Sequence, residues 1–166
     1  DKPNRVIVLT DAGSQKPFMA LACQYVFDYH FVGAAAAASG LALYRYEESG
    51  QVDNITDWAL KQFTAHYKEA AAAGAARAGA SKARKITKEA IFHYCYAVLH
   101  DPVYREKYAQ NLKREFPRIP FYPDFWQWAA WGEALMELHI GYESVEPLAL
   151  TRTDTPDDKA RAAGLP

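Results

Sequence analysis

TKEAIFHYCYAVLHDPVYREKYAQNLKREF, residues 87–116, is the stretch that decides the fold. Between Thr87 and Asp101, apolar residues cover most of the circumference of a helix, which predicts a central, largely buried helix. Thr87 is its expected N-cap, and Glu89 in the first turn suits the helix dipole. Asp101 followed by Pro102 predicts the end of this helix and the start of another, because Asp favours the N-cap and Pro the first helical position.

A second long helix is predicted over residues 102–116. Its apolar residues are spaced four apart on one stripe: Tyr104, Tyr108, Leu112 and Phe116. Its other side is polar and carries Lys107, Gln110, Asn111 and Arg114. Three prolines within residues 117–123 end this helix, because proline cannot continue a helical hydrogen-bond ladder.

A third helix is predicted to start after Asp124, whose side chain is expected to cap it. Its apolar residues recur at helical spacing: Phe125, Trp128, Gly132, Leu135 and His139, with Trp131 and Leu138 beside them. An aromatic stripe of this kind is typical of a packed core. We therefore expect the three tryptophans of this helix to dock it onto the two helices before it.

The N-terminal part is predicted to be β-rich. Four short segments are the expected strands: 5–10, 18–23, 26–32 and 41–48. In the last of these, charged and aromatic positions alternate, which predicts one charged and one aromatic face. Asp11 to Ser14 is a turn signal, and the alanine-rich residues 33–40 are expected to form a loop.

A helix and a connector follow the predicted strands. Residues 55–67 predict a helix with Thr56 as N-cap. Its apolar stripe consists of Trp58, Phe63 and Tyr67. Residues 68–85 are rich in alanine and basic residues, contain glycines and offer no apolar face, so a solvated connector is expected.

These elements predict an α+β fold, in which a small mixed or antiparallel sheet precedes a helical subdomain of three to four helices. The predicted organisation has four parts. They are a β-rich part with one helix (1–67), a connector (68–85), a helical subdomain (86–142) and a polar tail (143–166). The tail is interpreted as the truncated continuation of the domain.

Composition limits the class of protein. Half of the residues are apolar and 14% are aromatic, which predicts a globular domain with a sizeable core. No apolar run reaches the roughly 18–20 residues that a membrane helix needs, and the first residues show no signal-peptide pattern. Cys23 and Cys95 match no metal spacing and are expected to be buried thiols in a reduced cytoplasm.

The net charge of −1 hides a basic middle. Residues 68–118 hold 11 Lys and Arg against 5 Asp and Glu, whereas the parts before and after them are acidic. This distribution fits a polyanion-binding face, and it fits equally a solvated helix surface with a charged linker.

The sequence contains no catalytic motif. It lacks a GxxxxGK[ST] phosphate loop, a GxGxxG turn and a zinc-spaced Cys/His set, and it lacks the cofactor and target-base turns of an amino-methyltransferase. The five histidines are scattered, and the spacing of His93 and His100 is typical of packing. DAGSQKPF, residues 11–18, is a candidate phosphate contact, because its Gly-Ser turn is expected to expose backbone N–H groups beside Lys16.

The order of several segments resembles that of a known family. They are GSQKPF, DYHFVG, LYRYEE, ITDWALKQF, the stretch from Ile86 to Pro120, and ELHIGYESVEP. The chain from about Asn4 to Pro147 resembles the C-terminal target-recognition region of Type ISP single-polypeptide restriction–modification enzymes. The most specific part is FHYxYAVLHxPxYRExYxxxLKREFPRIP, whereas the poly-alanine stretch and the early end depart from the family pattern.

The resemblance implies a DNA-reading module of a larger enzyme with nuclease, helicase, coupler and adenine methyltransferase parts. S-adenosylmethionine, ATP and Mg would belong to those parts, and none of them to this chain. The implied partners are double-stranded DNA and the methyltransferase and coupler parts, in the cytoplasm. No catalytic or metal-binding residue is assigned. The candidate DNA-binding residues can contact phosphates or base edges: Lys16, Arg45, Lys107, Gln110, Asn111, Arg114 and Arg118.

Two other functions remain open from the residues. One is a non-catalytic docking or scaffold module, which predicts an exposed apolar patch and no affinity for DNA. The other is a helix-turn-helix regulator, which the tight Asp101-Pro102 junction suggests. DNA recognition predicts instead an affinity that falls steeply with salt, because neutralised phosphates release counterions.

Overall fold

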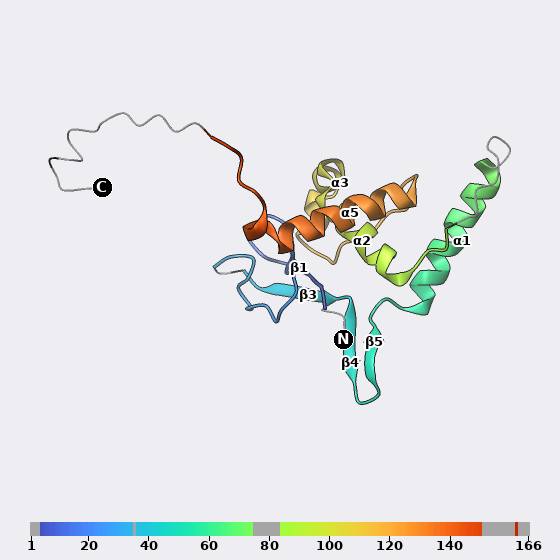
Figure 1. The fold of residues 1–166 in the computed structure, drawn as a ribbon, viewed down its shortest axis with the longest axis horizontal. Coiled ribbons are helices and arrows are strands. Elements are labelled where there is room, and N and C mark those ends of the chain that lie inside the picture. Colours follow the sequence, from blue (N-terminus) through green and yellow to red (C-terminus); the bar gives the residue numbers. More distant parts are fainter. Residues whose placement is uncertain (1–3, 35, 75–83, 151–161, 163–166) are drawn as a thin grey trace.

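The computed structural model describes residues 4–34, 36–74, 84–150 and residue 162, without the side chains of residues 69–74. The fold is α+β: two small antiparallel sheets come first, and helices follow (Figure 1). This confirms the predicted class, with antiparallel pairing throughout the described strands.

Strand β1 (Val6–Thr10) is the centre of a three-stranded sheet. It pairs antiparallel with β2 (Ala20–Cys23) and with β3 (Ala38–Ala42). Ile7 and Leu9 face the helical core, whereas Val8 belongs to a second cluster with Val32 and Ala36. Both faces of β1 are therefore covered, which explains its nearly continuous apolar sequence.

The predicted strand over residues 41–48 is interrupted at Leu43. This buried residue lies between the end of β3 and the start of β4 (Tyr44–Glu47), which pairs with β5 (Gly50–Asp53) in a separate hairpin. The hairpin projects from the body of the molecule (Figure 1). Its residues after Tyr44 are exposed on both faces up to Gln51, so the predicted aromatic face does not contribute to the core beyond Tyr44.

The strand predicted over residues 26–32 is wrong. Asp28 starts a turn there: its side chain accepts the backbone N–H of His30 at 2.8 Å, and its carbonyl accepts that of Phe31 at 2.9 Å. The loop folds back over the sheet, and a Cβ at Gly40 would lie 2.2 Å from the ring of Phe27. The alanine-rich loop after it is also shorter than predicted, because Ala38 already belongs to β3.

Helix α1 (Asp57–Gly74) begins where the sequence predicts and ends later. The hydroxyl of Thr56 accepts the backbone N–H of Ala59 at 3.2 Å, which confirms the N-cap. The predicted apolar stripe is wrong at Trp58, because that side chain is 71% exposed, whereas Phe63 is buried. The helix runs past residue 67 into the alanine-rich segment, of which residues 75–83 lie outside the described part of the chain.

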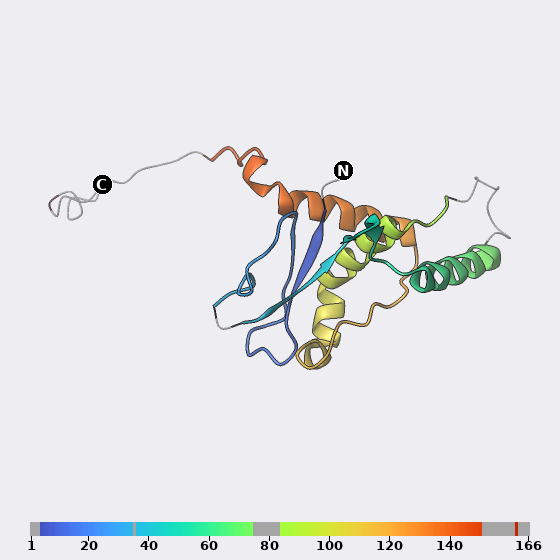
Figure 2. The same cartoon turned by 90° about the horizontal axis from the view of Figure 1, so that it is seen from below.

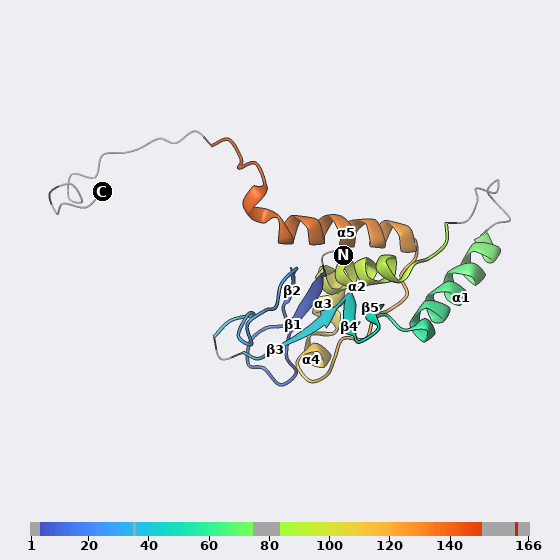
Figure 3. The same ribbon diagram turned by 60° about the horizontal axis from the view of Figure 1, so that its bottom comes forward.

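Helix α2 (Lys88–His100) is the buried centre of the fold, as predicted. Its Thr87 hydroxyl accepts the backbone N–H of Ala90 at 3.1 Å. Helix α5 (Phe125–Ile140) lies along it and forms the outer layer (Figures 2 and 3). A Cβ at Gly132 would lie 1.8 Å from the carbonyl oxygen of His93, so glycine is what allows the two helices to approach so closely.

Two predictions for α5 are wrong. Asp124 adopts a left-handed conformation and makes no side-chain cap; its carbonyl accepts the backbone N–H groups of the first turn. The stripe that packs on α2 is shifted from the predicted one and consists of Phe125, Ala129, Gly132 and Met136. Trp126 and Trp128 pack against the core, but Trp131 is 54% exposed, so only two of the three tryptophans dock the helix.

The long helix predicted over residues 102–116 is wrong. Asp101 caps a helix as predicted, accepting the backbone N–H of Val103 at 3.0 Å, but this helix, α3 (Pro102–Lys107), ends early. After Tyr108 a further short helix follows, α4 (Ala109–Leu112). Residue Phe116 is 53% exposed and not helical, which agrees with the restriction that Pro117 places on the residue before it.

The remaining features are local. A 3-10 turn, η1 (Tyr142–Ser144), follows α5. Cys23 and Cys95 are free and half-buried, so the prediction of two buried thiols is only partly right. Within the described residues, no helix is long and apolar enough to cross a membrane.

Candidate nucleic-acid interface

The seven candidate DNA-binding residues are all exposed. Lys16 lies in the loop between β1 and β2, and Arg45 lies in β4. The other five lie in α3, in α4 or in the chain that follows them: Lys107, Gln110, Asn111, Arg114 and Arg118. Six of these residues come from two neighbouring parts of the fold.

One hydrogen bond brings the two parts together. The backbone N–H of Gly13 donates to the carbonyl of Lys113 at 2.7 Å, so the turn after β1 lies against the end of α4. Figure 2 shows the same arrangement, with the loop between β1 and β2 beside the segment that follows α3. We call this surface the basic edge, and it consists of Lys16, Lys107, Gln110, Asn111, Lys113, Arg114 and Arg118.

Lys113 was missing from the candidates that the sequence suggested. Lys113 lay within one long predicted helix, and nothing in that helix marked it as a DNA contact. In the structure Lys113 is exposed, directly after α4, and its carbonyl contacts the loop between β1 and β2. The signal that could have found it is the pair Lys113-Arg114 directly before the prolines.

The turn before Lys16 differs from its prediction. The backbone N–H groups expected to be free for a phosphate are already bonded: that of Ser14 to the carbonyl of Asp11 at 3.2 Å, and that of Lys16 to the hydroxyl of Ser14 at 3.1 Å. With the amide of Gly13 bonded to Lys113, the turn offers the exposed Lys16 side chain and no cradle of amides.

Arg118, Glu115 and Asn111 form a polar network on the basic edge. The guanidinium of Arg118 pairs with one carboxylate oxygen of Glu115 at 2.8 Å. The amide of Asn111 donates to the other oxygen at 3.4 Å. The side chain of Arg118 is 86% exposed, so this pair contributes little to stability, and its value lies in orienting the guanidinium.

Arg45 stands apart from this edge. Its guanidinium pairs with Glu47 at 3.1 Å on the same strand. The hairpin that carries it projects on the side away from α3 (Figure 1), and the adjacent turn contains a further acid, Glu48. The structure therefore does not bring Arg45 together with the other six candidates.

A groove lies beside the basic edge, with a volume of about 360 Å³. Its walls combine aromatic and polar side chains, among them Tyr108, Phe116, Asn111 and Arg118. The ammonium of Lys107 lies 5.3 Å from the centre of the Tyr108 ring. The edge thus offers cations, an amide and exposed aromatic surface within one region.

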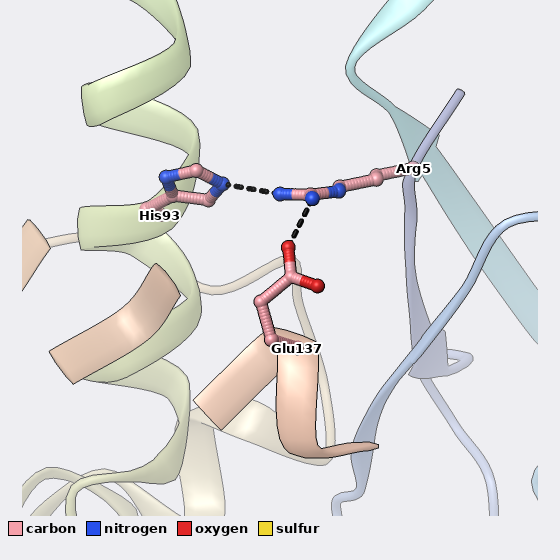
Figure 4. A network of polar contacts seen from close by, with 3 residues as sticks. All are labelled: Arg5, His93 and Glu137. Atoms are coloured by element: carbon pink, nitrogen blue, oxygen red, sulfur yellow. Dashed lines mark hydrogen bonds and ion pairs between the residues drawn. The ribbon is translucent and has the colours of Figure 1, made fainter. Parts of the chain in front are cut away.

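A polar contact away from the basic edge joins three elements (Figure 4). Arg5, just before β1, contacts Nε2 of His93 on α2 at 3.2 Å and pairs with Glu137 on α5. Burial, more than its charged neighbours, lowers the pKa of His93, so Nε2 accepts the hydrogen bond from the guanidinium. The contact ties the sheet to both helices and explains His93 as a structural residue.

The described residues supply no metal centre, because no group of three or more His, Cys, Asp or Glu is placed to hold an ion. The ring nitrogens of His100 lie 2.9 Å from the carbonyl of Tyr96 and 3.0 Å from that of Ala20, and the neutral ring donates to one of them; His139 bonds the hydroxyl of Tyr96 at 2.6 Å. Both rings are engaged in packing, in agreement with the structural role expected for the histidines.

Comparison with known proteins places the chain in a family. The family model of the Type ISP C-terminal specificity domain matches residues 1–164. The chain therefore belongs to this family, and it is a target-recognition domain of Type ISP restriction–modification enzymes. No curated protein matches the sequence significantly.

Solved structures show the same fold. A chain of the DrdV–DNA complex, determined by cryo-electron microscopy, is 46% identical over 98% of this chain, with a TM-score of 0.77. A nuclease-deletion mutant of the Type ISP enzyme LlaGI, in complex with a DNA substrate mimic, is 27% identical over 86%, with a TM-score of 0.61. The DNA-bound Type ISP enzyme LlaBIII shares the fold at 20% identity over 90%, with a TM-score of 0.65. The chain spans only 15%, 10% and 9% of these chains, respectively.

Proposed function

We propose that this domain binds double-stranded DNA through the basic edge and reads its sequence there. The observation that carries the proposal is the bond from Gly13 to Lys113, which joins the turn before Lys16 to the Lys113-Arg114 segment, about a hundred residues later in the sequence. Lysine and arginine side chains on such an edge contact phosphates, whereas Gln110 and Asn111 are of the types that pair with base edges. Arg118 can do either.

The family and the DNA complexes of similar proteins support the proposal. The six clustered candidates and Lys113 are all exposed and together carry an excess of positive charge. Arg45 is a secondary candidate, since its hairpin lies apart from the basic edge (Figure 1). A DNA contact by Arg45 requires the duplex to reach that hairpin as well.

The test is fluorescence anisotropy with mixed-sequence duplex DNA at several salt concentrations. The variant Lys107→Ala/Arg114→Ala removes two charges from the basic edge, and Lys61→Ala/Lys85→Ala removes two exposed charges elsewhere. If each lost charge is a phosphate contact, the first variant lowers the slope of log affinity against log salt by about 1.8, and the control leaves it unchanged. Equal effects of the two variants would contradict the basic edge as the binding surface.

We further propose that the larger protein is an adenine-specific DNA methyltransferase with nuclease and helicase parts that acts in the cytoplasm. S-adenosylmethionine, ATP and Mg would be bound by those parts. The described residues of this domain contain no cluster that fits a metal ion. The measurement is methyl transfer from labelled S-adenosylmethionine to duplex DNA by the larger chain, with and without this domain. We expect site-specific transfer to require the domain.

A second function, docking onto the methyltransferase and coupler parts, is favoured by one surface. Helix α5 exposes Trp131 and Leu138, and η1 after it exposes Tyr142. A hollow of about 490 Å³ lies at the C-terminal end of α5, lined partly by Tyr142, Tyr25 and Phe31. Exposed apolar area of this kind marks interaction sites. We expect Trp131→Glu/Leu138→Glu to abolish co-purification with those parts while DNA binding stays intact. Unchanged co-purification would contradict docking through this face.

The helix-turn-helix alternative receives no support. Its recognition helix would be the segment after Asp101, and this segment is split into α3 and α4, of six and four residues. Tyr104, in the middle of α3, is buried, so this helix has no long exposed face to place in a major groove.

A further inference from the structure

The chain between α4 and α5 is held by tyrosine hydroxyls from three helices. We call residues 117–123, which contain three prolines, the Pro-rich strap. It belongs to no helix or strand, so its carbonyls have no partners in a regular ladder. Instead, three alternate carbonyls each accept a hydrogen bond from a tyrosine.

The three bonds follow the strap in order. The hydroxyl of Tyr104 on α3 donates to the carbonyl of Arg118 at 3.0 Å. That of Tyr94 on α2 donates to the carbonyl of Pro120 at 2.8 Å. That of Tyr67 on α1 donates to the carbonyl of Tyr122 at 2.7 Å. In an extended chain, carbonyls two residues apart point to the same side, so all three meet the helical core.

Further bonds close this arrangement. The backbone N–H of Tyr122 donates to the hydroxyl of Tyr94 at 2.6 Å, and the hydroxyl of Tyr122 donates to Asp101 at 3.1 Å. Tyr94 and Tyr104 are almost fully buried. Burial raises the pKa of both hydroxyls, so they keep the protons that they donate.

The strap directs Arg118 outwards. Its carbonyl points to Tyr104, whereas its side chain is 86% exposed and its guanidinium is held by Glu115. The backbone of Arg118 is therefore held before any ligand arrives, and its side chain starts from the solvent-exposed side of the strap. Fixing a contact in advance reduces the entropy that is lost on binding.

We propose that Tyr104, with Tyr94 and Tyr67, positions Arg118 for its contact with DNA, so that these buried tyrosines are positioning residues of the interface. The inference rests on the proposed DNA-binding function of the basic edge. It assigns to the FPRIP segment the role of a pre-ordered support for an arginine contact. None of the three tyrosines touches DNA itself.

The test combines a double-mutant cycle with hydrogen exchange, on the 166-residue chain. Tyr104→Phe removes only the hydroxyl, and Tyr44→Phe is the matched control, since its hydroxyl makes no hydrogen bond with the described residues and its half-buried ring belongs to β4, away from the basic edge. Affinity for duplex DNA is measured for each variant with Arg118 and with Arg118→Ala. Amide exchange of Ile119, Phe121 and Tyr122 is measured without DNA.

We expect Tyr104→Phe to weaken DNA binding about threefold to tenfold, an effect typical of one lost hydrogen bond, and to lose this effect in the Arg118→Ala background. Exchange in the strap should become faster, and Tyr44→Phe should change neither quantity. A Tyr104→Phe effect that persists in full without Arg118, or unchanged exchange, would overturn the positioning role.

Failure of the proposed function gives a different pattern. In that case the wild-type chain shows no salt-sensitive affinity for DNA, or the Lys107→Ala/Arg114→Ala variant binds as the wild type does. If the basic edge binds DNA and Arg118→Ala alone binds as the wild type does, only the positioning inference falls. If Arg118→Lys binds DNA more tightly than Arg118→Ala but less tightly than the wild type, this supports a charge contact at this position.

Discussion

The α2–α5 pair and the basic edge are held together in different ways. In the pair, the two backbones approach so closely that no Cβ fits at Gly132, and the contact stripe is buried. In the basic edge, two short helices carry exposed polar side chains, and the bond from Gly13 to Lys113 links them to the loop after β1. Burial and close packing are concentrated in the α2–α5 pair, whereas the surface that we propose for recognition lies in the basic edge. Substitutions should therefore separate the two.

The largest expected effect is that of Gly132→Ala. The new Cβ would meet the carbonyl oxygen of His93, which is backbone and cannot move aside cheaply. We expect the free energy of unfolding to fall by about 3 kcal/mol or more, because overpacking here pushes α5 off α2. Urea denaturation followed by tryptophan fluorescence measures it. Ala134→Gly, at an exposed position of the same helix, should cost only about 1 kcal/mol, and equal losses would contradict the close approach.

The next effect tests the strap, which connects the two regions. Tyr94→Phe removes the donor to the Pro120 carbonyl and the acceptor of the Tyr122 amide, both in a buried site. We expect a loss of about 2 kcal/mol in the free energy of unfolding, because buried polar groups lose their partners. Tyr108→Phe should stay within about 0.5 kcal/mol of the wild type. Indistinguishable denaturation midpoints for the two variants would contradict a stabilising role for the hydrogen bonds between Tyr94 and the strap.

Acid should weaken the helical pair before it affects the basic edge. Burial lowers the pKa of His93 and of His100 from their ordinary values. Below about pH 6.5 the unfolded chain therefore binds protons that the folded chain does not, and stability falls as the pH falls. Urea midpoints between pH 7.5 and 5 measure this slope. His93→Gln should make the urea midpoint depend less on pH, whereas His30→Ala, at an exposed position, should not. A pH dependence unchanged by His93→Gln would contradict the role given to His93.

A smaller effect is expected for Lys113→Ala, and on DNA binding alone. The backbone carbonyl that accepts from Gly13 remains, so stability should change by less than about 0.5 kcal/mol. The loss of one phosphate contact should lower the salt slope of DNA affinity by about 0.9. Anisotropy titrations at several salt concentrations measure it, with Lys85→Ala as control. Loss of stability without a change in slope would show that Lys113 belongs to the structural region.

The smallest expected effect is that of Trp58→Ala. Although tryptophan usually contributes much to a core, this side chain is 71% exposed at the start of α1. We expect its loss to change the free energy of unfolding by less than about 0.5 kcal/mol. Trp128→Ala, which removes a half-buried ring packed on Tyr122, should cost clearly more in the same denaturation experiment. A large loss at Trp58 would mean that α1 is covered in solution.

Much of the helical part could be predicted from local signals. The caps at Thr87, Asp101 and Thr56 are confirmed, because an N-cap depends on residues within one turn. The burial of α2 followed from apolar residues on all its faces. The turn at Asp11 to Ser14 was also predicted. Its amides were expected to be free for a phosphate, and the hydrogen bond from Gly13 to Lys113 was not foreseen because Lys113 lies far along the chain.

The errors share one cause. Four-residue spacing predicted a long helix after Pro102, but α3 ends at Lys107, α4 spans only Ala109–Leu112, and Phe116 precedes a proline that disfavours helix there. Apolar residues at 26–32 suggested a strand, whereas Phe27 and Val32 cover a face of the sheet from a loop. Periodicity shows which residues are apolar. It does not show what they pack against.

The sequence by itself determined the fold class, the central helix with its caps, and the family to which the domain belongs, because these depend on local preferences and on a long, unusual motif. Only the tertiary structure decided which candidates share a surface. It joined Lys16 to the segment around Lys113, separated Arg45 from them, and placed three tyrosines from different helices on one strap. The physical reason is that such contacts are made between residues far apart in the chain, where no local pattern records the partner.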